Sequence, residues 1–168
     1  MHVRRALATA AVLAGIALAA GAIASPASPR NHTIRVYAPR ATTESCTRVF
    51  PLKRTVASPA VLTGALRALL AGPTAAERAR GYGGWFSGQT AGHLRGVRIA
   101  RGVAYVDFRN FARKIPNASS ACGSALLLAQ LDRTATQFPT VRRAVYSFDG
   151  SRRAFYEWLQ RDVPSTRP

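Results

Sequence analysis

The segment between residues 127 and 150 constrains the fold of this chain most, because it predicts a helix, a strand and a turn in fixed order. Pro139 ends the helix, since proline cannot continue its hydrogen bonds. Residues 144–148 then predict a strand, and Asp149-Gly150 predicts the turn after it. Five apolar residues recur at helical spacing and predict one broad helix face: Leu127, Leu128, Leu131, Ala135 and Phe138. Such a face has to pack on another element, so the segment predicts a domain of mixed helices and strands.

Two strands and two helices are predicted in the first half of the chain. Residues 33–37 alternate between polar and apolar, and residues 47–56 predict a second strand that an internal proline restricts to a sheet edge or breaks. Ser58-Pro59 predicts a helix start with Ser as the N-cap and Pro at the first helical position, and Gly72-Pro73 ends this helix. The sequence Thr-Ala-Ala-Glu at 74–77 predicts a capping box for a short second helix.

The remaining patterns complete the predicted order of elements. Residues 97–99 and 103–108 predict a hairpin around Arg101-Gly102, and Ser119 or Ser120 caps the late helix. Residues 152–160 predict a short helix with one aromatic side. The sequence therefore predicts an α+β fold with the order β-β-α-β-β-α-β. We expect one mixed β-sheet with two main helices on one face, plus the short C-terminal helix.

Two motifs resemble the GerMN domain family of bacterial sporulation and spore-germination proteins, which also occurs in actinobacterial envelope proteins. Residues 65–74 resemble the family helix that ends in L-L-x-G-P-T. Residues 129–141 resemble the family pattern of A-Q, T-x-T-Q and F-P-x-V, and Asp149-Gly150 resembles the D-G that follows a strand. The resemblance covers roughly residues 33–150.

The resemblance implies a non-catalytic module outside the cytoplasmic membrane, which acts through protein contacts in the cell envelope and is linked to sporulation or germination. Three polar residues of the motif, Gln130, Thr134 and Gln137, look like fold residues that hold the late helix to neighbouring loops. The resemblance therefore carries over no active site, no cofactor and no small-molecule substrate.

The N-terminal residues predict export. Residues 1–24 combine a short basic start, an apolar run and small residues before Ser25, which is typical of a signal peptide. The run is rich in alanine and only just reaches the roughly 18 residues of a membrane span, so cleavage is favoured over an uncleaved signal anchor. No cysteine lies near the cleavage region, which gives no support to a lipoprotein. We expect a flexible spacer at 25–32, the domain at 33–150, and a C-terminal helix and polar tail at 151–168.

The charge of the chain is strongly positive, with 24 Lys plus Arg against 7 Asp plus Glu and a formal net charge of +17. One interpretation is genomic bias, because arginine and alanine dominate and lysine is rare. The other is attraction to an anionic partner, such as an acidic protein face, a wall polymer or lipid head groups. Nucleic acid is not expected, because the basic residues are scattered and no binding motif accompanies them.

Cys46 and Cys122 are the two cysteines, and an even count in an exported chain predicts a disulfide. Unpaired thiols and a redox pair are the alternatives. The spacing is unlike C-x-x-C, and no further ligand lies nearby, which argues against a zinc site.

No catalytic motif occurs in the chain. We interpret His32 as a spacer residue and His93 as a loop residue, and the carboxylates are isolated in the sequence. A carboxylate pair assembled by the fold would support a small hydrolase. This is the third functional hypothesis, after an envelope module that acts through protein contacts and an electrostatic binder of anionic wall polymer or lipid. The candidate contact surface consists of aromatic residues in the glycine-rich loop 81–88 and in the C-terminal helix, unless these fold back on the core: Tyr82, Trp85, Phe155 and Trp158.

Overall fold

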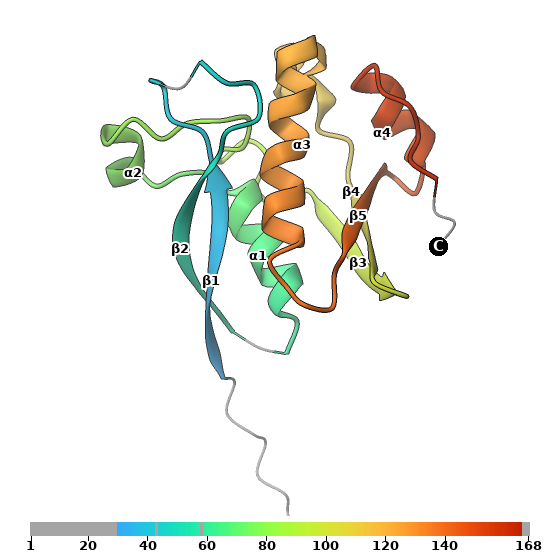
Figure 1. The fold of residues 1–168 in the computed structure, drawn as a ribbon, viewed down its shortest axis with the longest axis horizontal. Helices are drawn as coiled ribbons and strands as arrows, with labels where there is room; N and C mark the ends of the chain where they lie inside the picture. The colour runs from blue at the N-terminus through green and yellow to red at the C-terminus, as the bar shows by residue number, and fades with distance from the viewer. Residues whose placement is uncertain (1–29, 43, 58, 166–168) are drawn as a thin grey trace, which may run out of the picture.

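The structure is a computed structural model that describes residues 30–42, 44–57 and 59–165 (Figure 1). The predicted signal peptide, most of the predicted spacer, Ser58 and the end of the predicted tail lie outside the described residues. The elements follow one another as β1, β2, α1, α2, β3, β4, two 3-10 turns, α3, β5 and α4. The α+β class and the predicted order are therefore confirmed.

Within the described residues, the five strands form two sheets where the sequence predicted one. β1 (Asn31–Ala38) and β2 (Phe50–Ala57) make an antiparallel pair. β3 (Leu94–Ala100) and β4 (Val103–Phe108) make an antiparallel hairpin, and β5 (Arg143–Phe148) adds to β4 in parallel. The second sheet, in the order β3-β4-β5, is the mixed one. The predicted edge position of the second strand is confirmed, because β2 pairs with β1 alone among the described strands.

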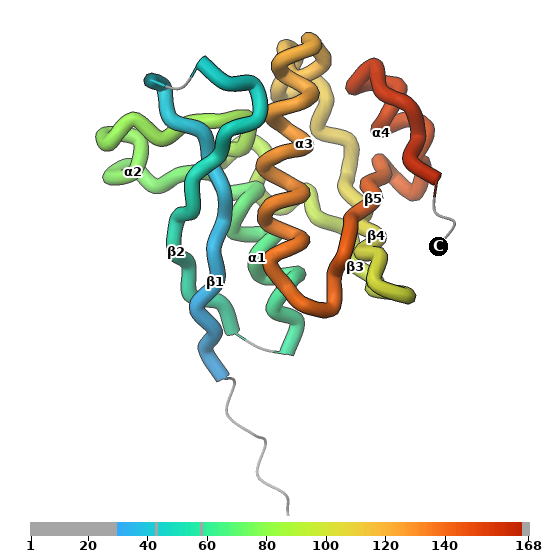
Figure 2. The backbone as a smooth tube through the Cα atoms, viewed as in Figure 1, coloured from blue at the N-terminus to red at the C-terminus, as the bar shows by residue number. Residues whose placement is uncertain are grey.

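Two helices join the sheets into one core. α1 (Val61–Leu70) contacts both sheets, and α3 (Ala121–Ala135) contacts α1, β1 and β5. Figure 1 and Figure 2 both show α3 between β1 and β5. Leucines at helical spacing fill the core between α1 and α3, because each helix packs one apolar stripe inward. The fully buried ones are Leu66, Leu70, Leu127 and Leu131.

The helix starts are set by local backbone and side-chain geometry. The predicted start of α1 at Pro59 is wrong by two positions, because Ala60 has a non-helical backbone (φ −96°, ψ 65°) and α1 begins after it. The capping box of α2 (Ala75–Ala79) is confirmed: the Thr74 hydroxyl accepts from the Glu77 N–H, and the Glu77 carboxylate accepts from the Thr74 N–H. Ser120 caps α3 by accepting from the N–H of Gly123.

Glu77 also anchors α2 to β2 through an ion pair. Arg54 donates from Nη1 to Oε1 and from Nη2 to Oε2, each at 2.7 Å. This hydrogen bonding lowers the pKa of Glu77 from 4.5 to about 2, against the opposing effect of burial.

We expect the native chain to lose stability as the pH falls from about 5 toward about 2. The sign follows because the pKa of Glu77 is lower in the folded chain than in the unfolded chain. The stabilisation that the ionised Glu77 carboxylate provides is therefore fully present above its pKa in the unfolded chain. It disappears as the pH falls through the pKa of Glu77 in the folded chain. Urea unfolding across this range checks it, and Glu77→Gln should flatten the profile. An equally steep loss in Glu77→Gln would contradict this prediction.

Candidate functional site

Three polar side chains, two from α3 and one from the turn after it, occupy the edge of β1 that β2 leaves open. Gln137 accepts from the Arg35 N–H at 2.9 Å and donates to the Arg35 C=O at 2.7 Å. Thr134 accepts from the Tyr37 N–H at 3.3 Å, and Gln130 donates to the Tyr37 C=O at 3.2 Å. Gln130 and Thr134 lie one turn apart on one face of α3, and Gln137 follows in the turn after it, so the three side chains take the place of a missing neighbouring strand.

Gln130 also fixes the glycine-rich loop. Its Oε1 accepts from the Trp85 N–H at 3.2 Å, and the side chain is 1 % exposed. Gly84 has φ +122°, and a Cβ there would lie 2.6 Å from the Gln130 Nε2. The predicted role of Gln130, Thr134 and Gln137 therefore needs a correction: they hold α3 chiefly to a strand, and Gln130 alone among them reaches this loop.

Gln130→Leu should lower the free energy of unfolding by about 2 kcal/mol, because it leaves the half-buried Tyr37 C=O and Trp85 N–H without the partner that they have in the native chain. Denaturant unfolding measures this change. Thr136→Ala at the C-cap of the same helix is the control, since Thr136 is exposed and its hydroxyl donates to the nearby Asp132 C=O. We expect this control to change stability by less than about 0.5 kcal/mol. Equal effects of the two substitutions would mean that Gln130 is not a structural bridge.

Tyr82 and Trp85 line a cavity of about 540 Å³ beside α3. We call it the Tyr82–Trp85 groove. Its other walls are the chain that follows β1, which includes Arg40 and Glu44, and the first turns of α3, which include Cys122 and Leu126. Both aromatic side chains are half-buried, so each supports the fold and still offers surface to a ligand.

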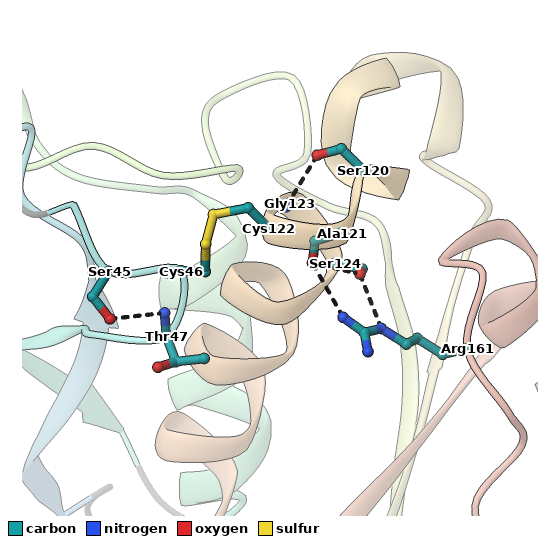
Figure 3. The surroundings of a disulfide bond; sticks show 9 residues. All are labelled: Ser45, Cys46, Thr47, Ser120, Ala121, Cys122, Gly123, Ser124 and Arg161. Atoms are coloured by element: carbon teal, nitrogen blue, oxygen red, sulfur yellow. Dashed lines mark hydrogen bonds between the residues drawn. A yellow bond between two sulfur atoms is a disulfide. The ribbon is translucent and has the colours of Figure 1, made fainter.

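The predicted disulfide joins two walls of the groove. Cys46, in the loop between β1 and β2, is bonded to Cys122 in the first turn of α3, with a Cα–Cα distance of 4.9 Å (Figure 3). Arg161 holds the same turn from the other side, because its guanidinium donates to the Ser124 Oγ at 3.0 Å and to the Ala121 C=O at 3.1 Å (Figure 3).

The loop wall is tied to the end of β1 by backbone hydrogen bonds. The Ala41 N–H donates to the Gly81 C=O at 2.9 Å, and the Gly83 N–H donates to the Pro39 C=O at 3.0 Å. A Cβ at Gly81 or Gly83 would meet no heavy atom within 4 Å. Because both glycines line the groove, their backbone is open to a close approach by a ligand.

The groove is positively charged at its rim. Arg40 donates to the Tyr82 hydroxyl at 3.1 Å, and its guanidinium carbon lies 4.7 Å from the centroid of the Tyr82 ring. Arg78 donates to the Pro73 C=O. Neither arginine has a carboxylate within 4 Å among the described residues, and Glu44 is the acidic residue of the lining.

The C-terminal helix needs a correction to the predicted contact surface. α4 (Arg152–Trp158) packs on β5, so its aromatic side folds back on the core, which is the alternative that the sequence left open. Phe155 is 0 % exposed and therefore cannot contact a partner. Its ring lies 4.9 Å from that of Phe148, and Trp158 is half-buried in the same aromatic cluster. The sequence pattern revealed an amphipathic helix but not what its aromatic side would pack on.

A second cavity, of about 440 Å³, brings together Asp132 and Asp162 with Tyr156. Asp132 accepts from the Tyr146 hydroxyl at 2.7 Å. Burial raises the pKa of Asp132, and burial together with this carboxylate raises the pKa of the Tyr146 phenol well above its usual value. Asp132 therefore has a structural task, which is to satisfy a hydroxyl in the core.

His32 and His93 lie apart from both cavities. His32 lies in β1, which corrects its assignment to the spacer, and His93 lies in the loop before β3. Within the described ranges, no group of three or more His, Cys, Asp or Glu residues is placed to hold a metal ion. In the same ranges, we find no helix with the length and apolar character needed to cross a membrane.

A protein-family model, Germane, described as "Sporulation and spore germination", matches residues 35–153. The match covers more than half of the chain. It contains the stripe of α3 that covers β1, the disulfide and every wall of the Tyr82–Trp85 groove. No curated protein and no solved structure matches the chain significantly.

Proposed function

We propose that this chain, which belongs to the Germane (GerMN) family of sporulation and spore germination, is an exported, non-catalytic module that binds an envelope protein through the Tyr82–Trp85 groove. The observation that carries the proposal is the groove itself. Tryptophan, tyrosine and arginine are the residues that most often dominate the energy of protein contacts, and Trp85, Tyr82 and Arg40 line one cavity here.

The rigid walls of the groove support a binding role. The disulfide holds one wall, the hydrogen bond from Trp85 to Gln130 holds another, and the pairing of the loop with β1 holds a third. A site that is already ordered loses little conformational entropy when a partner binds. Export is supported by the Cys46–Cys122 bridge, because disulfides persist in oxidising compartments.

A non-catalytic role is supported by the bonding of the Asp132 carboxylate. A hydrolase would use Asp132 with Asp162, which share a cavity. The Asp132 carboxylate, however, already accepts a hydrogen bond of 2.7 Å from the Tyr146 hydroxyl. This bond leaves Asp132 poorly placed to act as a nucleophile or a base.

A second candidate function is electrostatic binding of an anionic wall polymer or lipid surface. With 24 basic and 7 acidic side chains, most of the basic residues have no carboxylate with which to pair. Exposed arginines attract polyanions at low ionic strength, and salt screens this attraction over about 8 Å under physiological conditions. Salt sensitivity therefore separates the two candidates.

The test is an affinity pull-down from cell-envelope extract with the tagged chain, washed at low and high salt. Gly83→Val should remove a protein partner, because the new side chain fills the groove without meeting any protein atom within 4 Å of its Cβ. Gly88→Val is the matched control: it adds the same side chain to the same loop, also in open space, outside the groove.

A discrete protein should survive the high-salt wash with the native chain and with Gly88→Val, and disappear with Gly83→Val. Recovery of wall or lipid material alone, released by salt from all three chains, would overturn the proposal and favour the electrostatic candidate.

A further inference from the structure

The charges of the Tyr82–Trp85 groove indicate the chemistry of its occupant. Arg40 and Arg78 line the groove, and Glu44 is the acidic residue that opposes them. The Arg40 guanidinium is oriented by the Tyr82 ring at 4.7 Å and by the Tyr82 hydroxyl at 3.1 Å. A guanidinium that is already oriented retains donors for a carboxylate and loses little freedom on binding it.

The interior of the groove is apolar. Trp85 and Leu126 line it from the glycine-rich loop and from α3, and Cys122 of the disulfide lines it as well. A cavity of about 540 Å³ exceeds what a single carboxylate fills. It falls within the range of about 300–1,000 Å³ that is typical of ligand pockets lined by apolar side chains with a few polar groups. The occupant therefore combines apolar volume with negative charge.

The exposed glycine backbone favours an extended occupant. At Gly81 and Gly83 there is open space where a side chain would stand. A peptide backbone can approach this wall closely, whereas a bulky polymer gains nothing from it.

We infer, on the basis of the proposed function, that the groove binds an acidic peptide segment of the partner protein. An apolar side chain of the segment packs against Trp85 and Leu126, and flanking carboxylates bind Arg40 and Arg78. A phosphate polymer would satisfy the arginines but leave the apolar wall uncovered. A second copy of this chain is disfavoured, because each copy has a net charge of +17.

The experiment selects peptides from a random display library on the folded, oxidised chain. We expect the selected peptides to place Asp or Glu beside a large apolar residue. The best peptide is then labelled, and its affinity is measured by fluorescence anisotropy for the native chain and for variants.

The double variant Arg40→Glu with Arg78→Glu should bind the peptide at least about tenfold more weakly, because each arginine then repels a carboxylate that it bound before. Arg113→Glu with Lys114→Glu is the matched control. It changes the net charge equally at two exposed residues outside the groove, and it should bind within about twofold of the native chain. Arg40→Lys with Arg78→Lys keeps the charge, and part of the affinity should remain, which guards against a folding defect in the reversed variant.

Three results would overturn the inference. The first is selection of peptides without an acidic preference. The second is equal weakening by the groove variant and the control, which would mean that bulk charge is responsible. The third is binding of vesicles that contain phosphatidylglycerol with the same dependence on Arg40 and Arg78, which would replace the peptide by a lipid surface.

Gly83→Val separates this inference from the proposed function. If Gly83→Val abolishes peptide binding and the arginine variants do not, the groove is the site but its occupant is not acidic. If Gly83→Val binds like Gly88→Val, the groove is not the site and both proposals fail.

Discussion

Phe155→Ala is expected to lower the free energy of unfolding by about 4 kcal/mol, within the range measured for removing a buried phenylalanine ring. Phe155 is 0 % exposed, and its ring contacts those of Phe148, Tyr146 and Trp158 at centroid distances of 4.9, 5.5 and 5.9 Å. The substitution would leave a cavity between α4 and β5 that these rigid rings cannot close. Urea unfolding followed by far-ultraviolet circular dichroism measures the loss.

Arg153→Ala provides the comparison within the same helix. Arg153 is fully exposed, and its pairing with Glu157 lies in solvent, so its removal should leave the unfolding curve in place. If Phe155→Ala were equally silent, α4 would not belong to the core. Phe155 would then again be a candidate contact residue, a role that its burial in this structure excludes.

Replacing Cys46 and Cys122 together by serine should also lower the free energy of unfolding, by about 4 kcal/mol in the chain-entropy model. The bridge closes a loop across a sequence separation of 76 residues, so it restricts the unfolded chain strongly. The midpoint of thermal unfolding should fall by roughly 10–15 °C. Calorimetry of the oxidised and the reduced chain gives the same comparison without a substitution.

The two measurements should agree with one another. Reductant should shift the native chain to the midpoint of the double serine variant and should not shift the variant itself. A native chain that is insensitive to reductant, although its two thiols become accessible to labelling, would show that the fold holds the loop without the bridge.

The predictability of the fold differs between its elements for physical reasons. α3 and β5 were predictable because apolar spacing, Pro139 and Asp149-Gly150 are local signals. The division into two sheets was not. The two sheets stay separate because Gln130, Thr134 and Gln137 cover the open edge of β1. The spacing of these three residues in the sequence does not indicate which strand they bind.

The candidate site was predictable from its aromatic half. Tyr82 and Trp85 stand out in a glycine-rich loop, but Arg40 and Arg78 are two among 24 basic residues, and the pairing of Pro39–Ala41 with the loop brings them together. One usable signal remained in the sequence: Glu44 lies two residues before Cys46, so a bridge to Cys122 places it beside α3.

The cover that α3 provides for β1 has a consequence for the order of folding. The residues that it joins are 93 to 102 positions apart, so β1 keeps an unpaired edge until residue 137 is available. A chain that emerges from its N-terminus, from a ribosome or through a membrane pore, therefore presents an open strand edge for most of its passage. Such edges pair with other chains and lead to aggregation. Under the proposed export, slow translocation should therefore lower the yield of this protein more than slow synthesis of its last residues.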